Sequence, residues 1–171
     1  MEIRPGLPSD AIEASAVLRR SITELCGADH GGDNGKIAVW TANKTPEEWL
    51  SWLSQEGVLV CVAVLENRIA GVGAVTFSGA VMLNYVSPDA RFSGVSKALL
   101  ASMEVAAQAH GAVRCTLEST KTAYKFYQAA GYSKMENDCV AGGWMAKSLP
   151  ADPTRSSGAC RRTVLILASL Q

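Results

Sequence analysis

The chain has 171 residues, of which 48% are hydrophobic and 19% are charged. A chain of this length can bury one sizeable core, and the composition is ordinary for a globular protein. Sixteen basic and sixteen acidic residues give a net charge of zero, which argues against nucleic acid or an anionic membrane as a partner. We find no apolar span of membrane length, no signal peptide and no repeat, so the expected location is cytoplasmic.

The amino-terminal third predicts a short strand and two helices. Residues 2–4 indicate the strand, and small and apolar side chains recur at helical spacing over residues 14–25. Thr45 and Glu48 predict a capping box that starts the second helix. Between the helices, residues 27–35 contain four glycines, which favours a flexible loop that can act as a lid.

Three apolar strands are predicted next. Residues 58–64 and 69–77 are apolar runs on either side of a turn at Glu66 and Asn67, which is typical of a buried hairpin. Residues 81–86 supply the third strand. A strand at 113–118, a helix at 123–130 and a closing strand at 145–149 complete the order expected for an α/β layer with a mixed sheet.

A loop that opens a long helix follows the third strand and indicates an anion site. Its sequence is Arg91-Phe92-Ser93-Gly94-Val95-Ser96, and helical spacing continues to residue 109. Backbone N–H groups at a helix start have no intrahelical partners and carry partial positive charge, so they favour phosphate oxygens. The loop lacks the Gly-Lys-Ser/Thr ending of a P-loop and the three glycines of a dinucleotide fingerprint, which points to a different phosphate ligand.

This loop resembles the Arg/Gln-x-x-Gly-x-Gly/Ala pyrophosphate loop of the GNAT superfamily of acyl-CoA-dependent N-acyltransferases. Leu99 and Leu100 follow it as they do in that family, while Ser96 departs from the usual Gly or Ala. Serine is small and keeps its backbone N–H, so we expect the departure to be tolerated.

A second resemblance lies about thirty residues later, in the helix at 123–130. Ala123, Tyr127 and Gly131 keep the spacing of the family's Asn-x-x-Ala-x-x-x-Tyr-x-x-x-Gly-Phe signature. Thr120 stands where Asn is common, and Tyr132 replaces Phe. Two ordered signatures at this separation argue against a chance match.

The resemblance covers residues 1–149 and implies a single GNAT domain. Its sheet is expected to be mixed and mostly antiparallel, with about six to seven strands, about four flanking helices and a splay that holds acyl-CoA. Acetyl-CoA is the implied cosubstrate and an amine the implied acceptor, with no metal. The residues implied to bind the donor are Asn84, Tyr85, Val86, Arg91, Phe92, Ser93, Gly94, Val95, Ser96, Lys97, Thr120, Ala123 and Tyr127.

The resemblance also implies a direct attack of the amine on the thioester. Tyr127 is the expected general acid for the coenzyme A thiolate, because a phenol with a pKa near 10 is protonated at neutral pH. Glu118 is the first candidate for the general base, with a solvated strand-end carboxylate as the alternative. In the family, the region between the first two helices borders the acceptor site. The expected substrate contacts in this region are therefore Asp29, His30 and Trp40.

The sequence is compatible with three functional classes. The first is an enzyme that acetylates a small amine, which the elaborated region from 26 to 55 favours. The second is an acyl-CoA-binding module without catalysis, and the third is a protein or peptide N-acetyltransferase. The acceptor, the range of acyl groups and the oligomeric state are open as well.

Five cysteines are scattered without metal-ligand spacing, and they predict neither a metal site nor a disulfide framework. Cys61 and Cys115 fall in predicted strands and are expected to be small buried groups. Residues 150–171 predict a linker and an apolar segment from 163 to 170, which we expect to add a strand to a sheet or to form a homodimer contact.

Overall fold

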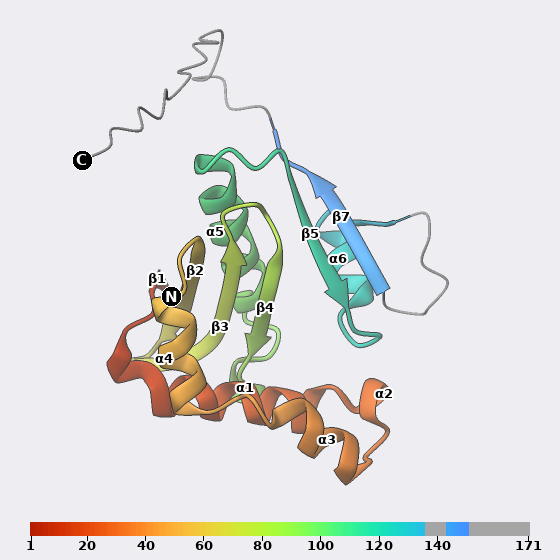
Figure 1. Cartoon of the computed structure of the whole chain (residues 1–171). Coiled ribbons are helices and arrows are strands. Elements are labelled where there is room, and N and C mark those ends of the chain that lie inside the picture. Colours follow the sequence, from red (N-terminus) through yellow and green to blue (C-terminus); the bar gives the residue numbers. More distant parts are fainter. Residues whose placement is uncertain (136–142, 151–171) are drawn as a thin grey trace, which may run out of the picture.

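The computed structural model describes residues 1–135 and 143–150, which form two sheets with helices around them (Figure 1). The strands are β1 (Glu2–Pro5), β2 (Val58–Leu65), β3 (Arg68–Thr76), β4 (Val81–Val86), β5 (Arg114–Ser119), β6 (Ser133–Lys134) and β7 (Gly143–Ser148). The α-helices are α1 (Ala11–Leu25), α2 (Gly27–His30), α3 (Asn34–Thr41), α4 (Pro46–Ser54), α5 (Val95–Ala109) and α6 (Tyr124–Ala129). Two 3-10 turns are η1 (Pro8–Asp10) and η2 (Pro88–Ala90).

The two sheets meet at one end and separate at the other. The first sheet has the order β1-β2-β3-β4 and the second the order β5-β7-β6. Every strand pair in them is antiparallel, and a parallel bridge joins Ala80, the residue before β4, to Thr116 of β5. Beyond this bridge the two strands diverge (Figure 1). The predicted α/β class with a splayed, mostly antiparallel sheet is confirmed.

Helices cover both faces of the first sheet, which explains why its strands are apolar throughout. Helix α5 lies on one face, while α1 and α4 lie on the other (Figure 1). Alternate residues of β2 therefore enter different cores. Cys61 and Ala63 pack with α5, whereas Val60 and Val62 pack with α1 and α4. A sheet buried on both faces requires such continuous apolar strands.

Several local predictions are confirmed. The Thr45 hydroxyl accepts a hydrogen bond from the Glu48 N–H at 3.2 Å and caps α4. Both Glu66 and Asn67 have positive φ angles, of 52° and 59°, as a two-residue hairpin turn between right-twisted strands requires. Trp49 of α4 is fully buried and donates to the Leu7 carbonyl at 2.9 Å.

The glycine-rich segment at 27–35 is more ordered than predicted. It forms α2 and the start of α3, with left-handed Gly31 and Gly32 between them at φ angles of 63° and 78°. The Asp33 carboxylate caps α3 by accepting from the Lys36 N–H at 3.0 Å. The loop prediction was wrong here because these caps tolerate glycine between two helical turns.

Cys61 and Cys115 are buried as expected, and the described residues contain no cluster of metal ligands. No helix in residues 1–135 or 143–150 has the length and apolarity needed to cross a membrane. The predicted apolar segment from 163 to 170 lies outside the described residues, as do Cys139 and Cys160.

Candidate active site

An inner cavity of about 510 Å³ opens where β4 and β5 diverge. Its walls come from the last turn of α1, from β4, from the start of α5 and from the segment that joins β5 to α6. The predicted site residues that line it are Asn84, Tyr85, Val86, Arg91, Phe92, Gly94, Val95, Ser96, Lys97, Glu118, Thr120, Ala123 and Tyr127. Among the residues predicted to bind the donor, Ser93 is the exception, since it is outside the lining and its hydroxyl donates to the Ala90 carbonyl at 2.6 Å.

The start of α5 presents unused backbone donors to this cavity. Gly94 has a φ angle of 82° and forms the N-cap, and the first bond of the helix runs from the Ala98 N–H to the Gly94 carbonyl at 3.0 Å. The N–H groups of residues 95–97 therefore have no acceptor within the helix. Arg91 and Lys97 add positive charge to the same wall. The arrangement suits a phosphate group.

A close approach between α5 and the first sheet fixes the position of this helix start. A Cβ atom added to Gly71 of β3 would lie 2.5 Å from Val95 Cγ1 and 2.9 Å from Leu99 Cδ1. Glycine at this position allows α5 to lie directly on β3, and α5 then holds its first turn beside β4.

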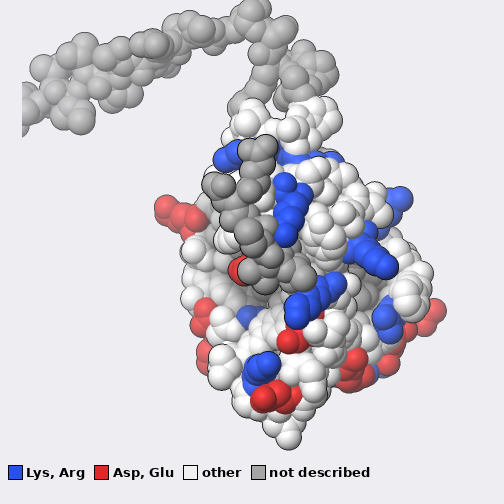
Figure 2. Space-filling model, turned by 90° about the vertical axis from the view of Figure 1, so that its right-hand side faces the viewer, with Lys and Arg blue, Asp and Glu red and all other residues white. Residues whose placement is uncertain are grey.

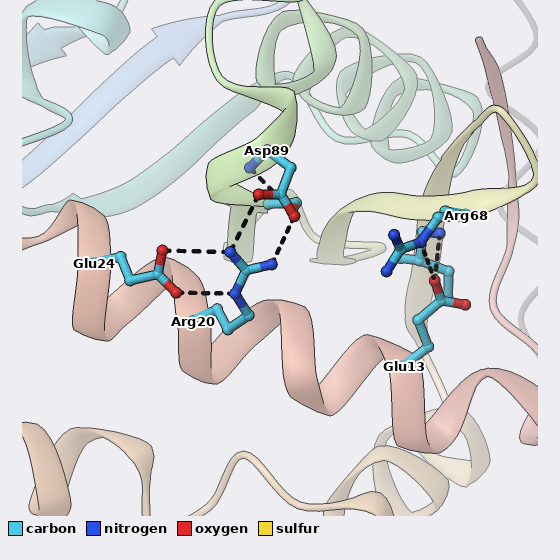
Figure 3. A network of polar contacts seen from close by, with 7 residues as sticks. Glu13, Arg20, Glu24, Arg68 and Asp89 are labelled. Atoms are coloured by element: carbon cyan, nitrogen blue, oxygen red, sulfur yellow. Dashed lines mark hydrogen bonds and ion pairs between the residues drawn. The ribbon is translucent and has the colours of Figure 1, made fainter.

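Ion pairs hold α1 against the turn that precedes the loop (Figure 3). Arg20 binds the carboxylate of Asp89 with two hydrogen bonds, of 2.7 and 3.2 Å, and also binds Glu24 one helical turn along. The same pairing holds the pKa of Asp89 below its usual value. Glu13 and Arg68 form a looser contact at 4.0 Å further along α1. These contacts bring the last turn of α1 to the inner cavity.

The Asn84 side chain has an unused hydrogen-bonding atom at this cavity. Its Nδ2 donates weakly to the Ser96 carbonyl at 3.4 Å. Its Oδ1 is buried and, in the described part of the chain, has no donor. A buried acceptor without a partner is costly, and an N–H group of a bound ligand would satisfy it. The coenzyme A pantetheine arm carries two amide N–H groups, so the residues present fit this ligand.

Tyr127 of α6 lies almost fully buried in the wall of the inner cavity, with 7% of its surface exposed. Its ring makes edge contacts with Phe126 and Tyr132, at centroid distances of 5.0 and 5.7 Å. Burial raises the pKa of Tyr127 to about 12, and the neighbouring Asn84 amide partly opposes this change. The phenol is therefore protonated at any physiological pH.

Thr120 supports the segment that carries Tyr127. Its hydroxyl accepts from the Ala123 N–H at 3.1 Å and so caps the turn that leads into α6. This is the position where the sequence differs from the family's Asn, and threonine supplies the same kind of acceptor.

A second depression, the outer hollow, adjoins the inner cavity and has a volume of about 1290 Å³. The two share Tyr85, Glu118 and Thr120 among their walls. Met82 also lines both, and the outer hollow is further lined by Trp40, Trp144, Met135, Asp29 and Lys44. On the face of the molecule that carries β7, basic side chains occupy the middle and acidic ones gather toward the end formed by α1 to α3 (Figure 2). Charges of both signs therefore surround this region.

One phenol, Tyr85, and one carboxylate, Glu118, stand at the junction of the cavities. Trp40 donates from its indole nitrogen to the Tyr85 hydroxyl at 3.2 Å, and burial raises the pKa of Tyr85 to about 12. Glu118 is exposed near the end of β5 and lies opposite Trp144 in the second sheet. Trp40 thus lies in the wall of the outer hollow, and its contact with substrate stays a prediction.

Asp29 and His30 have structural contacts that the sequence did not indicate. The Asp29 carboxylate accepts from the backbone N–H groups of Lys121 and Thr122, at 2.7 and 3.2 Å, and so ties α2 to the turn before α6. Asp29 still lines the outer hollow. His30 is only 4% exposed, and its Nδ1 accepts from the Gly32 N–H at 3.0 Å, which leaves Nε2 to donate to the Ile22 carbonyl at 3.1 Å.

The expected contact of His30 with substrate is therefore not supported by its position, since the side chain lines neither the inner cavity nor the outer hollow. Sequence reasoning also missed Cys26 and Lys44. Cys26 lines the inner cavity, where burial raises its pKa to about 11. Lys44 is buried in the wall of the outer hollow with a lowered pKa, also because of burial. Neither residue lies in a sequence motif, and only tertiary contacts bring the two side chains to the site, so no local sequence signal indicates them.

Comparison with known proteins agrees with this site. A family model described as an acetyltransferase (GNAT) domain matches residues 28–147. A GCN5-related N-acetyltransferase from Rhodopseudomonas palustris is similar in structure, with a TM-score of 0.77, 26% identity and coverage of 86% of this chain and 95% of that one. No curated protein matches the sequence.

Two further structures share the fold at lower identity. PaiA N-acetyltransferase from Thermoplasma acidophilum, solved in complex with coenzyme A, has a TM-score of 0.74 and 19% identity, with coverage of 86% of this chain and 98% of that one. An aminoglycoside 6'-N-acetyltransferase from Enterococcus faecium has a TM-score of 0.65 and 16% identity, with coverage of 89% and 99%.

The fold, the cavity and the family match define an acyltransferase that uses acetyl-CoA as its cosubstrate. The chain belongs to the GNAT acetyltransferase family.

Proposed function

We propose that the protein transfers the acetyl group of acetyl-CoA to the amine of a small acceptor with an apolar or aromatic body. One observation carries the proposal. The inner cavity, which contains the helix start and Tyr127, adjoins the aromatic outer hollow at Tyr85 and Glu118. A donor in the first space and an acceptor in the second would meet at these residues.

The inner cavity offers complementary groups along the length of the donor. The N–H groups of residues 95–97, with Arg91 and Lys97, would bind the pyrophosphate. The outer edge of β4 at residues 84–86 would pair with the pantetheine amides, because β4 has β3 on one side and diverges from β5 on the other. An extra residue in β4, Met82, shifts the register just before this segment.

The chemistry follows from the protonation states. The neutral amine attacks the thioester carbonyl, and the tetrahedral intermediate expels coenzyme A as a thiolate while the nitrogen loses its extra proton. Tyr127 would give its proton to the sulfur, since its phenol is protonated and lines the inner cavity. Glu118 would accept the proton from the nitrogen, directly or through water, because its carboxylate lies at the junction of both spaces.

The outer hollow supports the class of acceptor. Trp40, Trp144 and Tyr85 supply aromatic surface, and Met82 and Met135 add apolar surface. Glu118 and Asp29 add negative charge that favours an ammonium group near the junction. We also propose that residues 1–149 act as one domain in this reaction, which agrees with a family match that ends at residue 147.

Two experiments test the proposal. Calorimetric titration with acetyl-CoA is expected to show binding at one site, and a folded sample that fails to bind would refute it. Thiol release from acetyl-CoA is then measured with alkylamines, arylalkylamines, amino acids and short peptides. Faster turnover of arylalkylamines than of matched peptides supports the small acceptor, whereas the reverse order identifies a peptide N-acetyltransferase. The thiols of Cys26, Cys61 and Cys115 are buried with raised pKa values, which limits their contribution to the thiol signal.

A further inference from the structure

Phe92 combines two unfavourable features in the loop before α5. Its φ angle is 64°, in the left-handed region that a bulky side chain rarely adopts, and 91% of its surface is exposed. The other described non-glycine residues with positive φ are Glu66 and Asn67, which form a tight hairpin turn. Phe92 lies outside any such hairpin, so the turn geometry of the sheet does not account for it.

The fold itself makes little use of this ring. Within the described residues, its ring makes a cation–π contact with the guanidinium of Arg91, which lies 4.7 Å from the ring centroid. Arg91 thus covers one part of the ring, and the large exposed fraction leaves a face open to solvent. A strained backbone that holds an exposed aromatic ring is a feature that a ligand can account for.

The position of Phe92 indicates which part of a ligand would reach it. Phe92 lines the inner cavity and precedes the helix-start N–H groups of residues 95–97, whereas Tyr127 lines the same cavity at its buried side. In acetyl-CoA the pyrophosphate separates the pantetheine thioester from the adenosine. With the thioester beside Tyr127 and the pyrophosphate at the helix start, the adenosine extends toward solvent, on the side where Phe92 is exposed.

We propose that Phe92, with Arg91 behind its ring, is a stacking platform for the adenine of acetyl-CoA. The inference rests on the proposed binding of acetyl-CoA in the inner cavity. An adenine has a flat π surface that stacks on aromatic rings and on guanidinium groups. The platform makes the adenosine part of what the protein recognises, so free acyl-CoA is preferred to an acyl group carried on phosphopantetheine alone.

The test combines protein variants with shortened donors. Kd is measured by calorimetry for acetyl-CoA, for acetyl-dephospho-CoA and for S-acetyl-4'-phosphopantetheine, which lacks the adenosine. The variants are Phe92→Gly, Phe92→Leu and Phe92→Tyr. Glycine and leucine are expected to weaken acetyl-CoA and acetyl-dephospho-CoA binding about tenfold, while tyrosine keeps it within about twofold. The phosphopantetheine donor is expected to bind all forms with similar affinity.

The outcomes distinguish adenine stacking from a general disturbance of the loop. An equal loss for the donor that lacks adenosine, or no loss for acetyl-CoA in Phe92→Gly, would overturn the platform. Thermal unfolding is the check on folding, and Phe92→Gly is expected to keep or raise the midpoint because glycine adopts a positive φ without strain. If the unaltered protein bound neither acetyl-CoA nor the shortened donors, the proposed function would fail together with the platform.

Discussion

The indole nitrogen of Trp40 donates a hydrogen bond to the hydroxyl of Tyr85, at 3.2 Å and across 45 residues of sequence. This bond ties α3 to β4 at the junction of the inner cavity and the outer hollow. Because the Tyr85 oxygen accepts from Trp40, the hydroxyl proton remains available for a second bond. The pair therefore both shapes the junction and presents a donor to it.

Trp40→Phe removes this bond and should weaken acceptor binding. We expect KM for the acceptor to rise about fivefold to tenfold, in keeping with one lost hydrogen bond of about 1–1.5 kcal/mol, while the Kd of acetyl-CoA is unchanged. Steady-state kinetics with calorimetry measure both. Tyr85→Phe is the matched variant, and the double variant should be less harmful than the sum of the two. Fully additive effects would show that the bond does not couple them.

Tyr127→Phe should lower turnover with little change in acetyl-CoA affinity. Loss of a positioned general acid costs roughly 10²-fold to 10⁴-fold in rate. Because the pKa of Tyr127 is about 12, its deprotonation should cause no fall in kcat between pH 7 and about pH 10. Phe126→Leu, which alters the neighbouring ring, is the control for packing. Unchanged turnover in Tyr127→Phe would remove this residue from the acid role.

Alkaline pH should destabilise the protein through its buried phenols. Burial raises the pKa of Tyr85 and of Tyr127 to about 12, whereas an unfolded tyrosine titrates near pH 10. Between these values the native state binds more protons than the unfolded state, so the free energy of unfolding falls as pH rises. The contribution of each phenol is fully present below about pH 10 and amounts to about 2–3 kcal/mol. Urea titrations from pH 9 to 11.5 measure the fall, and Tyr127→Phe should make it shallower.

Gly71→Ala should destabilise the fold by about 1–3 kcal/mol, the usual cost of overpacking a core. The added methyl group would lie 2.5 Å from Val95 Cγ1 and 2.9 Å from the Tyr85 carbonyl oxygen. Gly27→Ala is the matched control, because nothing lies within 4 Å of a Cβ atom there and its φ is not in the left-handed region. Chemical denaturation measures both. Equal stabilities for the two variants would contradict the close packing of α5 on β3.

Asp89→Asn should reduce stability by a small amount that depends on salt. The Arg20 and Asp89 side chains are 43% and 66% exposed, so water and salt screen the ion pair. Arg20 lowers the pKa of Asp89, and the contribution is therefore present above the ordinary aspartate pKa and lost as pH falls. Thermal unfolding at low and high salt is the measurement. A difference from the unaltered protein that persists in 1 M salt, where screening is nearly complete, would argue for a steric cause.

Sequence was a good guide wherever the determining contacts are local. The Thr45 N-cap of α4 and the hairpin turn at Glu66 and Asn67 involve residues within a few positions of each other, and both formed as predicted. The main strands and helices could also be predicted in their order, because the spacing of apolar residues along an element reflects which of its faces is buried. The sequence motifs indicated that Tyr127 and the loop before α5 contact the same ligand, and both line the inner cavity.

The remaining errors arise from contacts between distant segments. His30 was expected to contact substrate, but its side chain is buried and its Nε2 bonds to the Ile22 carbonyl in the last part of α1. On α5, Leu100 and Ala107 are buried in addition to the apolar face that helical spacing defines, whereas Ala98 and Ala106 on that face are only partly buried, because this helix contacts strands of both sheets. A single-face pattern cannot describe a helix that lies between two surfaces.

The divergence of β4 and β5 affects the stability of the protein toward association when no cosubstrate is bound. Each sheet ends at this gap in an edge strand, and edge strands with unpaired backbone groups invite association with other chains. On the proposed mode of binding, the pantetheine arm occupies the edge of β4 and blocks it. Acetyl-CoA would then protect the folded chain as well as supply the acetyl group. Depletion of the metabolite would lower both the reaction rate and the amount of protein that survives to perform the reaction.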